Sequence, residues 1–160
     1  MKAVVLKKFG GIENFEVEEI PIPSIKPGYV LIKVHASSVN PVDFKIRQGL
    51  LPVGPCLPAV LHGDLSGEVV EVGQGITGFM KGDPVYGCVG GFSELPGVLT
   101  EFALADARLL AHKPRNLSFE EAAALPLVAI TSWNALVDRA KVKKGQKILV
   151  HASMGGVGHI

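Results

Sequence analysis

The sequence predicts a mainly β protein, in which a turn-rich β-barrel or sandwich is followed by helices and by the opening of a second unit. Three observations support this fold class. The 160 residues include 19 glycines and 11 prolines, more than an ordinary domain carries. Short runs of branched residues alternate with turn residues as far as about residue 110. Helical patterns then begin near residue 118, and a glycine-rich turn follows them.

Composition narrows the possible partners. With 48% hydrophobic and 19% charged residues, the chain is globular rather than disordered. The net charge of +1 is too balanced for a surface that neutralises a phosphate backbone, so we expect no nucleic-acid partner. The longest apolar stretch, 122–131, is too short to span a bilayer, so we expect no membrane partner. The cysteines Cys56 and Cys88 form no CxxC pair, which favours a reducing compartment and a cytoplasmic protein.

The β part contains five runs with the branched, partly alternating composition of strands. Turn residues separate these runs, including proline pairs and Gly-Asp-Pro. Because the strands are short and the turns frequent, a barrel or sandwich is the expected arrangement. The predicted strands are 2–6, 15–19, 29–37, 66–72 and 99–104.

Two helical runs follow the β part. Ser118 is a plausible N-cap, with Glu121 at the spacing of a capping box. The second run covers 126–140, with apolar residues at roughly 3.6-residue spacing and Pro126 in its first turn. We therefore expect one β domain over residues 1–120, and a helical linker with the start of a second domain over residues 121–160.

The last motif follows a predicted buried strand at 147–152 and reads Ser153-Met154-Gly155-Gly156-Val157-Gly158. A strand that leads into a glycine-rich turn and a helix presents backbone N–H groups to a pyrophosphate, as in Rossmann domains. Ser153 replaces the first glycine of that fingerprint, so an ordinary tight turn remains an alternative. The acidic residue that reads the cofactor's ribose would come roughly 20 residues further on, after residue 160. We expect only the first strand and turn of such a domain here.

Five local segments together carry a resemblance to one known family. They are Asn40-Pro41-Val42-Asp43, Gly63-Asp64-Leu65-Ser66-Gly67, Gly82-Asp83-Pro84-Val85, Ala123-Ala124-Leu125-Pro126 and Gly155-Gly156-Val157-Gly158. With these segments in this order, the chain is similar throughout to the N-terminal half of a medium-chain dehydrogenase/reductase of the zinc-independent quinone oxidoreductase branch. The resemblance implies a GroES-like β domain followed by a linking helix and the nucleotide turn of a Rossmann domain.

The resemblance also implies a function, namely NADPH-dependent hydride transfer to a quinone or an α,β-unsaturated carbonyl. It implies a homodimer when the protein is full-length, and inactivity of this chain by itself. Asn40 and Asp43 are the expected catalytic residues, and Asn40 and Asp64 the expected substrate contacts. Asn40 would equally suit a turn before Pro41, Asp43 a helix cap, and Asp64 the start of a strand. The expected cofactor-binding residues are Asn40, Thr131, Met154, Gly155, Gly156, Val157 and Gly158.

No metal is expected. Zinc-dependent alcohol dehydrogenases supply a cysteine, a hydroxyl and a histidine where this sequence has Asn40, Val42 and Gly63. Two other hypotheses stay open at this point. One is a zinc-dependent alcohol dehydrogenase that uses the neighbouring His62 and Asp64, and the other is a GroES-like binding or interaction module without catalysis. By spacing alone, none of the five histidines is assigned to catalysis.

Overall fold

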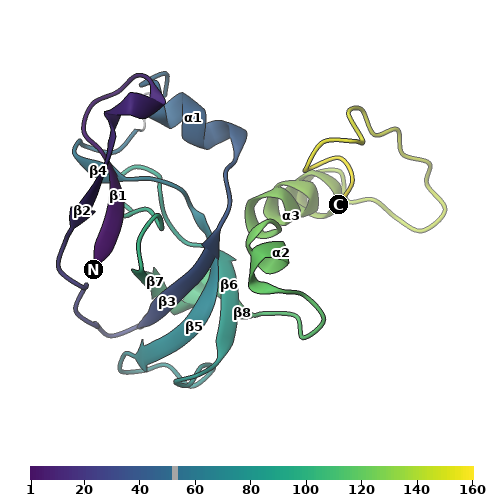
Figure 1. Cartoon of the computed structure of the whole chain (residues 1–160). Helices are drawn as coiled ribbons and strands as arrows, with labels where there is room; N and C mark the ends of the chain where they lie inside the picture. Colours follow the sequence, from purple (N-terminus) through teal and green to yellow (C-terminus); the bar gives the residue numbers. More distant parts are fainter. Residues whose placement is uncertain (52–53) are drawn as a thin grey trace.

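A computed structural model describes residues 1–51 and 54–160, and these residues form two antiparallel sheets (Figure 1). The smaller sheet has the strand order β2-β1-β4, and the larger has the order β7-β3-β5-β6-β8. The predicted mainly β fold class is confirmed. The strands are β1 (Lys2–Leu6), β2 (Phe15–Glu19), β3 (Tyr29–Ser37), β4 (Ala59–Val60), β5 (Asp64–Val72), β6 (Pro84–Cys88), β7 (Phe102–Asp106) and β8 (Leu110–His112).

Three predicted strands, 2–6, 15–19 and 29–37, have the observed bounds. The prediction for 99–104 is wrong in its bounds, because β7 covers Phe102–Asp106. Thr100 instead makes an isolated bridge to Ala3 of the smaller sheet, so the chain passes from one sheet to the other before β7 begins. Strands β4, β6 and β8 were not predicted, since β4 and β8 are very short and β6 lies within turn-type residues.

Two apolar clusters stabilise the β part. The larger contains the buried residues Val30, Ile32, Leu65 and Val85 of the five-stranded sheet. The smaller joins Leu6 of β1 and Leu61 to Ile46 of helix α1 (Pro41–Arg47). Helix α1 was not predicted, although Pro41 occupies a favourable first-turn position. It follows β3 directly and thereby places residues 38–43 beside the start of β5.

The segment Asp64–Gly67 at the start of β5 connects the β part to the helices. The Ser66 hydroxyl is buried and donates a hydrogen bond to the carbonyl of Phe119. A Cβ at position 67 would lie 2.2 Å from the backbone oxygen of Lys33, so this close approach of β5 to β3 requires Gly67. Ser66 and Gly67 therefore each have a structural role at this connection.

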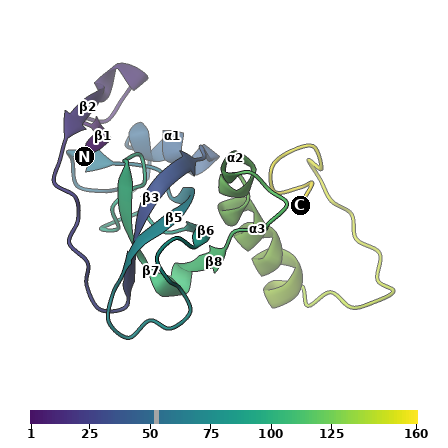
Figure 2. The same ribbon diagram turned by 60° about the horizontal axis from the view of Figure 1, so that its bottom comes forward.

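The helices lie beside the β part, between it and the C-terminal segment (Figures 1 and 2). Helix α2 (Phe119–Ala123) contacts β3, β5 and β6, and α3 (Pro126–Trp133) contacts β5 and β6. The predicted capping box is confirmed, because Ser118 Oγ accepts from Glu121 N at 3.1 Å and Glu121 Oε2 accepts from Ser118 N at 2.8 Å. The run predicted as 126–140 is helical to residue 139, its last part being a π-helix. The remaining helical segments are η1 (Ile12–Asn14), η2 (Ala107–Leu109) and that π-helix, η3 (Asn134–Arg139).

The strand predicted at 147–152 is wrong for this structure. Residues 147–150 have no regular secondary structure, and 151–154 form a turn. Ile148, Leu149 and Val150 are exposed, and the segment extends away from the β part (Figure 1). A strand needs a neighbouring strand for its backbone hydrogen bonds, and the described residues place none beside 147–150. Within the described part of the chain, no helix has both the length and the apolar character needed to cross a bilayer.

Candidate active site

Asn40, Asp43 and Asp64 come together where β3, α1 and β5 meet. Asn40 caps α1, and its backbone N–H donates to Asp43 Oδ2 at 2.6 Å. Its side-chain Nδ2 donates to Asp64 Oδ2 at 2.9 Å. All three residues are buried, with exposed fractions of 6%, 3% and 0%. The three predicted site residues, Asn40, Asp43 and Asp64, are thus joined by two hydrogen bonds. Together they form a cluster of two carboxylates and one amide.

The carboxylate of Asp64 accepts hydrogen bonds from the segment 38–40 and from the first turn of α3. Besides the Asn40 amide, Ser38 Oγ donates to Oδ2 at 3.1 Å. The backbone N–H of Leu127, in the first turn of α3, lies 3.1 Å from Oδ1 and 3.3 Å from Oδ2. Because Asp64 is fully buried and both its oxygens accept protein donors, its carboxylate is not presented to a ligand in this structure.

Asn40 retains a donor that a ligand could use. Its amide nitrogen carries two hydrogens. Asp64 accepts one of them, and within residues 1–51 and 54–160 no second acceptor receives a hydrogen from this nitrogen. The carboxylate therefore fixes the amide in a direction in which one N–H remains available. Asn40 is the residue of this cluster with the chemistry to hold a developing negative charge.

Electrostatics around the cluster involve His62 and Cys88 as well. Burial raises the pKa of Asp43, against the opposing effects of the Asn40 N–H and of His62. Burial lowers the pKa of His62, although Asp43 and Asp64 both act to raise it. Burial, together with the neighbouring carboxylates, raises the pKa of Cys88 to about 12. Cys88 is therefore a neutral thiol at ordinary pH, and its reactivity is low.

His62 belongs to this region although no sequence spacing indicated it. Its Nδ1 lies 3.5 Å from Ser37 Oγ, and its backbone has a positive φ of 70°. A left-handed histidine is uncommon, and such conformations occur more often than average at functional sites. Ser38 and the Leu127 amide were missed as well. The only available signal for His62 and Ser38 was their closeness in sequence to the motif residues. For Leu127 there was no such signal, and its contact with Asp64 is seen only in the fold.

Thr131 and the glycine turn lie on or against the same helix. Thr131 is exposed on α3, and its Oγ1 donates to the Leu127 carbonyl at 2.8 Å. Ser132 Oγ donates to the Val157 carbonyl at 2.9 Å, which attaches the glycine turn to α3. A Cβ at position 158 would lie 2.3 Å from the Ala152 carbonyl oxygen, so this tight turn requires Gly158.

Of the predicted cofactor residues, Asn40 lies in the buried cluster, whereas Thr131 and the glycine turn lie on and against α3. Met154 is 96% exposed, and Gly155, Gly156 and Val157 are exposed too. In the described chain the N–H groups of Gly156 and Val157 donate to no other residue. Exposed, unused N–H groups on a glycine turn are the donors that a phosphate group requires, so these residues fit the pyrophosphate of a dinucleotide.

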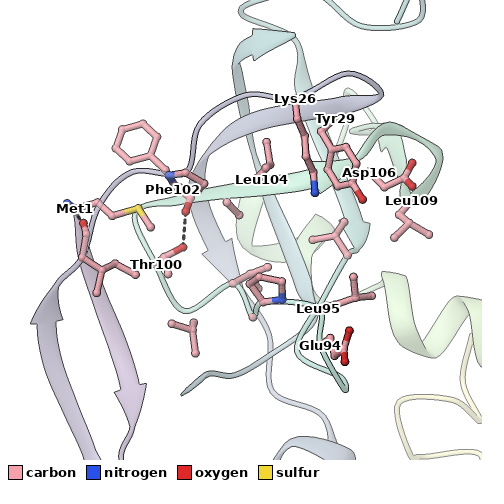
Figure 3. A pocket seen from close by; sticks show the side chains of 18 of the residues that line it. Met1, Lys26, Tyr29, Glu94, Leu95, Thr100, Phe102, Leu104, Asp106 and Leu109 are labelled. Carbon is pink, nitrogen blue, oxygen red and sulfur yellow. Dashed lines mark hydrogen bonds between the residues drawn. The ribbon is translucent and has the colours of Figure 1, made fainter. Parts of the chain in front are cut away.

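A separate apolar cavity of about 810 Å³ runs along β7 (Figure 3). None of Asn40, Asp43, Asp64 and Thr131 lines it. Its size alone would make it a default candidate for ligand binding, but the polar groups that converge at the β3–α1–β5 junction lie outside it. We therefore locate the candidate site at that junction. Among the cavity's lining residues are Lys26, Tyr29, Leu95, Phe102, Leu104 and Leu109.

Metal-binding groups were sought in the same region. Over residues 1–51 and 54–160, no group of three or more His, Cys, Asp or Glu side chains is arranged to hold a metal ion. At the junction, Asn40 and Gly63 supply no metal-binding thiolate or imidazole, and the Asp64 oxygens already accept hydrogen bonds. The positions at which alcohol dehydrogenases supply a cysteine and a histidine therefore offer no zinc ligand here.

Known proteins resemble the chain in sequence and in structure. A chloroplast envelope quinone oxidoreductase homolog of Arabidopsis thaliana is 42% identical over 94% of this chain and 47% of its own length. An NADPH-dependent alkenal/one oxidoreductase of the same plant is 41% identical over 100% of this chain and 43% of its own length. A crystal structure of an alcohol dehydrogenase superfamily protein from Novosphingobium aromaticivorans superposes with a TM-score of 0.95 and 45% identity, covering 99% of this chain and 48% of that one.

The chain thus spans about half the length of the curated relatives it matches. These similarities confirm the predicted resemblance to the quinone oxidoreductases of the medium-chain dehydrogenase/reductase superfamily. The family model of the alcohol dehydrogenase GroES-like domain matches residues 26–115, more than half of the sequence. By sequence and by fold, this chain belongs to the family of alcohol dehydrogenase GroES-like domains.

Proposed function

We propose that this chain forms the substrate-binding half of an NADPH-dependent oxidoreductase that reduces a quinone or an α,β-unsaturated carbonyl without a metal. The observation that carries the proposal is the Asn40 amide, which Asp64 holds at 2.9 Å with one N–H left unused. The relatives named as a quinone oxidoreductase homolog and as an NADPH-dependent alkenal/one oxidoreductase support the substrate class and the cofactor.

Asn40 would act on the acceptor's oxygen. When a conjugated carbonyl accepts a hydride, negative charge develops on its oxygen, and a fixed hydrogen-bond donor stabilises that charge. The unused N–H of Asn40 is such a donor, and Asp64 holds the amide in place before the substrate arrives. Asp43 would hold the same residue by its backbone N–H. Burial of this cluster keeps water away and strengthens these hydrogen bonds.

The cofactor would lie along α3. When bound, the nicotinamide supplies the hydride. Thr131 would contact the nicotinamide end, and the exposed amides of Gly156 and Val157 would bind the pyrophosphate. Met154, Gly155 and Gly158 shape the same turn, which Ser132 holds against α3. The contact of Leu127, in the first turn of this helix, with Asp64 supports this arrangement.

The donor set supports the metal-free part of the proposal. Zinc in alcohol dehydrogenases requires deprotonated thiolate or neutral imidazole ligands. Here Asn40 offers an amide where alcohol dehydrogenases supply a cysteine. A conjugated acceptor spreads charge without a Lewis acid, so the reaction does not depend on zinc. A homodimer of the full-length protein and a cytoplasmic location complete the proposal.

The decisive experiment follows NADPH oxidation by the full-length gene product with a simple quinone and with an enone. Turnover that is unchanged after dialysis against a chelator supports the proposal. Activity that is lost on chelation and restored by zinc would favour the alcohol dehydrogenase hypothesis. Absence of both NADPH binding and turnover would favour a non-catalytic binding module.

The variant Asn40→Ala tests the role of the amide. We expect kcat/KM for the quinone to fall by about 10²- to 10³-fold, which is the usual effect of removing one oxyanion donor. Steady-state kinetics at saturating NADPH measure this, with Asn116→Ala, an exposed asparagine outside the site, as the matched control. Unchanged kcat/KM in Asn40→Ala would remove Asn40 from the mechanism.

A further inference from the structure

Asp64 connects the substrate cluster to the helix that carries the proposed cofactor contacts. We propose that Asp64 is a positioning residue, which sets the distance between the Asn40 amide and α3 rather than touching the substrate. The proposal rests on the proposed function for its catalytic consequence. Its structural part, the connection of α3 to the β domain through one buried carboxylate, stands on the hydrogen bonds alone.

Three hydrogen bonds made by residues of α3 support this role. The Leu127 amide donates to Asp64, and the Leu127 carbonyl accepts from Thr131 one turn later on α3. The next residue, Ser132, donates to Val157 of the glycine turn. Movement of α3 relative to Asp64 would therefore displace both predicted cofactor contacts relative to Asn40.

The two carboxylate oxygens of Asp64 have different hydrogen-bond partners. Oδ2 lies within hydrogen-bond distance of Ser38, Asn40 and Leu127, whereas the shorter contact of Leu127, at 3.1 Å, is with Oδ1. The Cys88 thiol also forms a side-chain hydrogen bond with this carboxylate. An ionised carboxylate suits this arrangement, because it has two acceptor oxygens and no hydrogen to direct. No lysine or arginine pairs with Asp64 in the described part of the chain, so its charge is stabilised by these donors and by the N-terminal end of α3.

Full burial separates this role from that of a substrate contact. Asp64 has an exposed fraction of 0%, and a ligand could reach its oxygens only by displacing Ser38, Asn40 or Leu127. Asn40, with its unused N–H, is the group that remains for the substrate. The sequence-based assignment of Asp64 to substrate binding is replaced here by control of the geometry between substrate and cofactor.

The substitution Asp64→Asn separates the contact of the carboxylate with Asn40 from its contact with α3. Asparagine keeps one acceptor oxygen, and the three donors around Oδ2 favour placing that oxygen there. The new NH₂ group then faces the Leu127 N–H, which loses its 3.1 Å contact with Oδ1 and keeps only the longer 3.3 Å contact with the Oδ2 position. The connection to α3 is therefore weakened while Asn40 stays bound. Ser38→Ala is the matched control within the cluster, because it removes a donor to Oδ2 and leaves Leu127 bonded to Oδ1.

Amide hydrogen exchange of this chain tests the structural part. In Asp64→Asn we expect exchange at Leu127 to increase about tenfold or more, as for the loss of a charge-assisted hydrogen bond. Exchange at Val69, whose N–H donates to the Asp83 carbonyl, reports on the β domain and should change less. Unchanged exchange at Leu127, an equal increase at Val69, or an equal increase at Leu127 in Ser38→Ala would each overturn the proposal.

Kinetics of the full-length gene product test the functional part. We expect Asp64→Asn to raise the Kd and the KM for NADPH about tenfold while the KM for the quinone changes little. A purely structural role would lower the active fraction, and hence kcat, without altering either KM. Asp83→Asn, which removes a turn carboxylate bonded to Met80 N, is the control for such general loss. If the wild type does not bind NADPH, the proposed function fails while the exchange result at Leu127 still decides the structural part.

Discussion

At the scale of single residues, the candidate site is built from groups that each have a structural partner. Asn40 and Asp43 were open to two interpretations, as a turn or helix cap and as site residues. The structure shows that the capping geometry is real, since the Asn40 N–H donates to Asp43. It leaves the Asn40 side chain bonded to Asp64 instead, so the cap and the proposed catalytic role use different atoms of the same residue.

His62 makes the stability of this region dependent on pH. Burial lowers its pKa below the ordinary value for histidine, so the folded chain resists the protonation that the unfolded chain accepts. Its contribution to stability is complete above the unfolded pKa and is lost as the pH falls through the folded pKa. Asp43 and Asp64 oppose the shift, whereas the neutral Cys88 thiol adds no charge.

Urea unfolding between about pH 8 and about pH 5 measures this effect. We expect wild-type stability to decline more steeply toward acid than that of His62→Gln, which cannot be protonated there. His112→Gln, at an exposed histidine of β8, should decline as the wild type does. Parallel curves for the wild type and His62→Gln would contradict the lowered pKa of His62.

At the scale of elements, the sequence predicted correctly those features whose hydrogen-bond partners lie a few residues apart. The Ser118 capping box needs only residues three positions apart, and it was predicted with the correct partner, Glu121. The strand at 99–104 failed for the opposite reason. Its bounds depend on the bridge between Thr100 and Ala3, a contact between residues far apart in sequence.

The capping box at α2 gives a stability prediction. Ser118→Ala should lower the free energy of unfolding by about 1 kcal/mol, because the Glu121 N–H loses its acceptor. Ser118→Asp, which keeps an acceptor oxygen, should be close to the wild type, and Ser24→Ala at an exposed loop position is the neutral control. Urea denaturation would settle the point, and a wild-type midpoint for Ser118→Ala would argue against a stabilising cap.

At the scale of the whole molecule, α2 and α3 connect the β domain to the C-terminal segment (Figure 2). The boundary predicted between residues 120 and 121 falls inside α2, which packs on the large sheet. Ser66 holds α2 through the Phe119 carbonyl, and Asp64 holds α3 through the Leu127 amide. Two neighbouring polar residues of one strand therefore set the position of both helices.

The segment 147–152 provides a test at this scale. In the 160-residue chain we expect the amides of Ile148, Leu149 and Val150 to exchange rapidly, because these residues are exposed and unpaired in the described structure. In a longer polypeptide that supplies neighbouring parallel strands, the same amides should be protected. Strong protection in a monodisperse monomer of this chain would refute the first expectation, and rapid exchange in the longer polypeptide would refute the second.

The sequence by itself determined the mainly β class, three of the strands, the capping box and the family resemblance, because each depends on composition or on short spacings. It also named Asn40, Asp43 and Asp64 before their proximity was known. Only the tertiary structure decided that Asp64 accepts from the Leu127 amide, that His62 joins the cluster, and that 147–152 is not a strand here. Those outcomes depend on contacts across more than 20 residues, and on neighbouring strands, which no local pattern encodes.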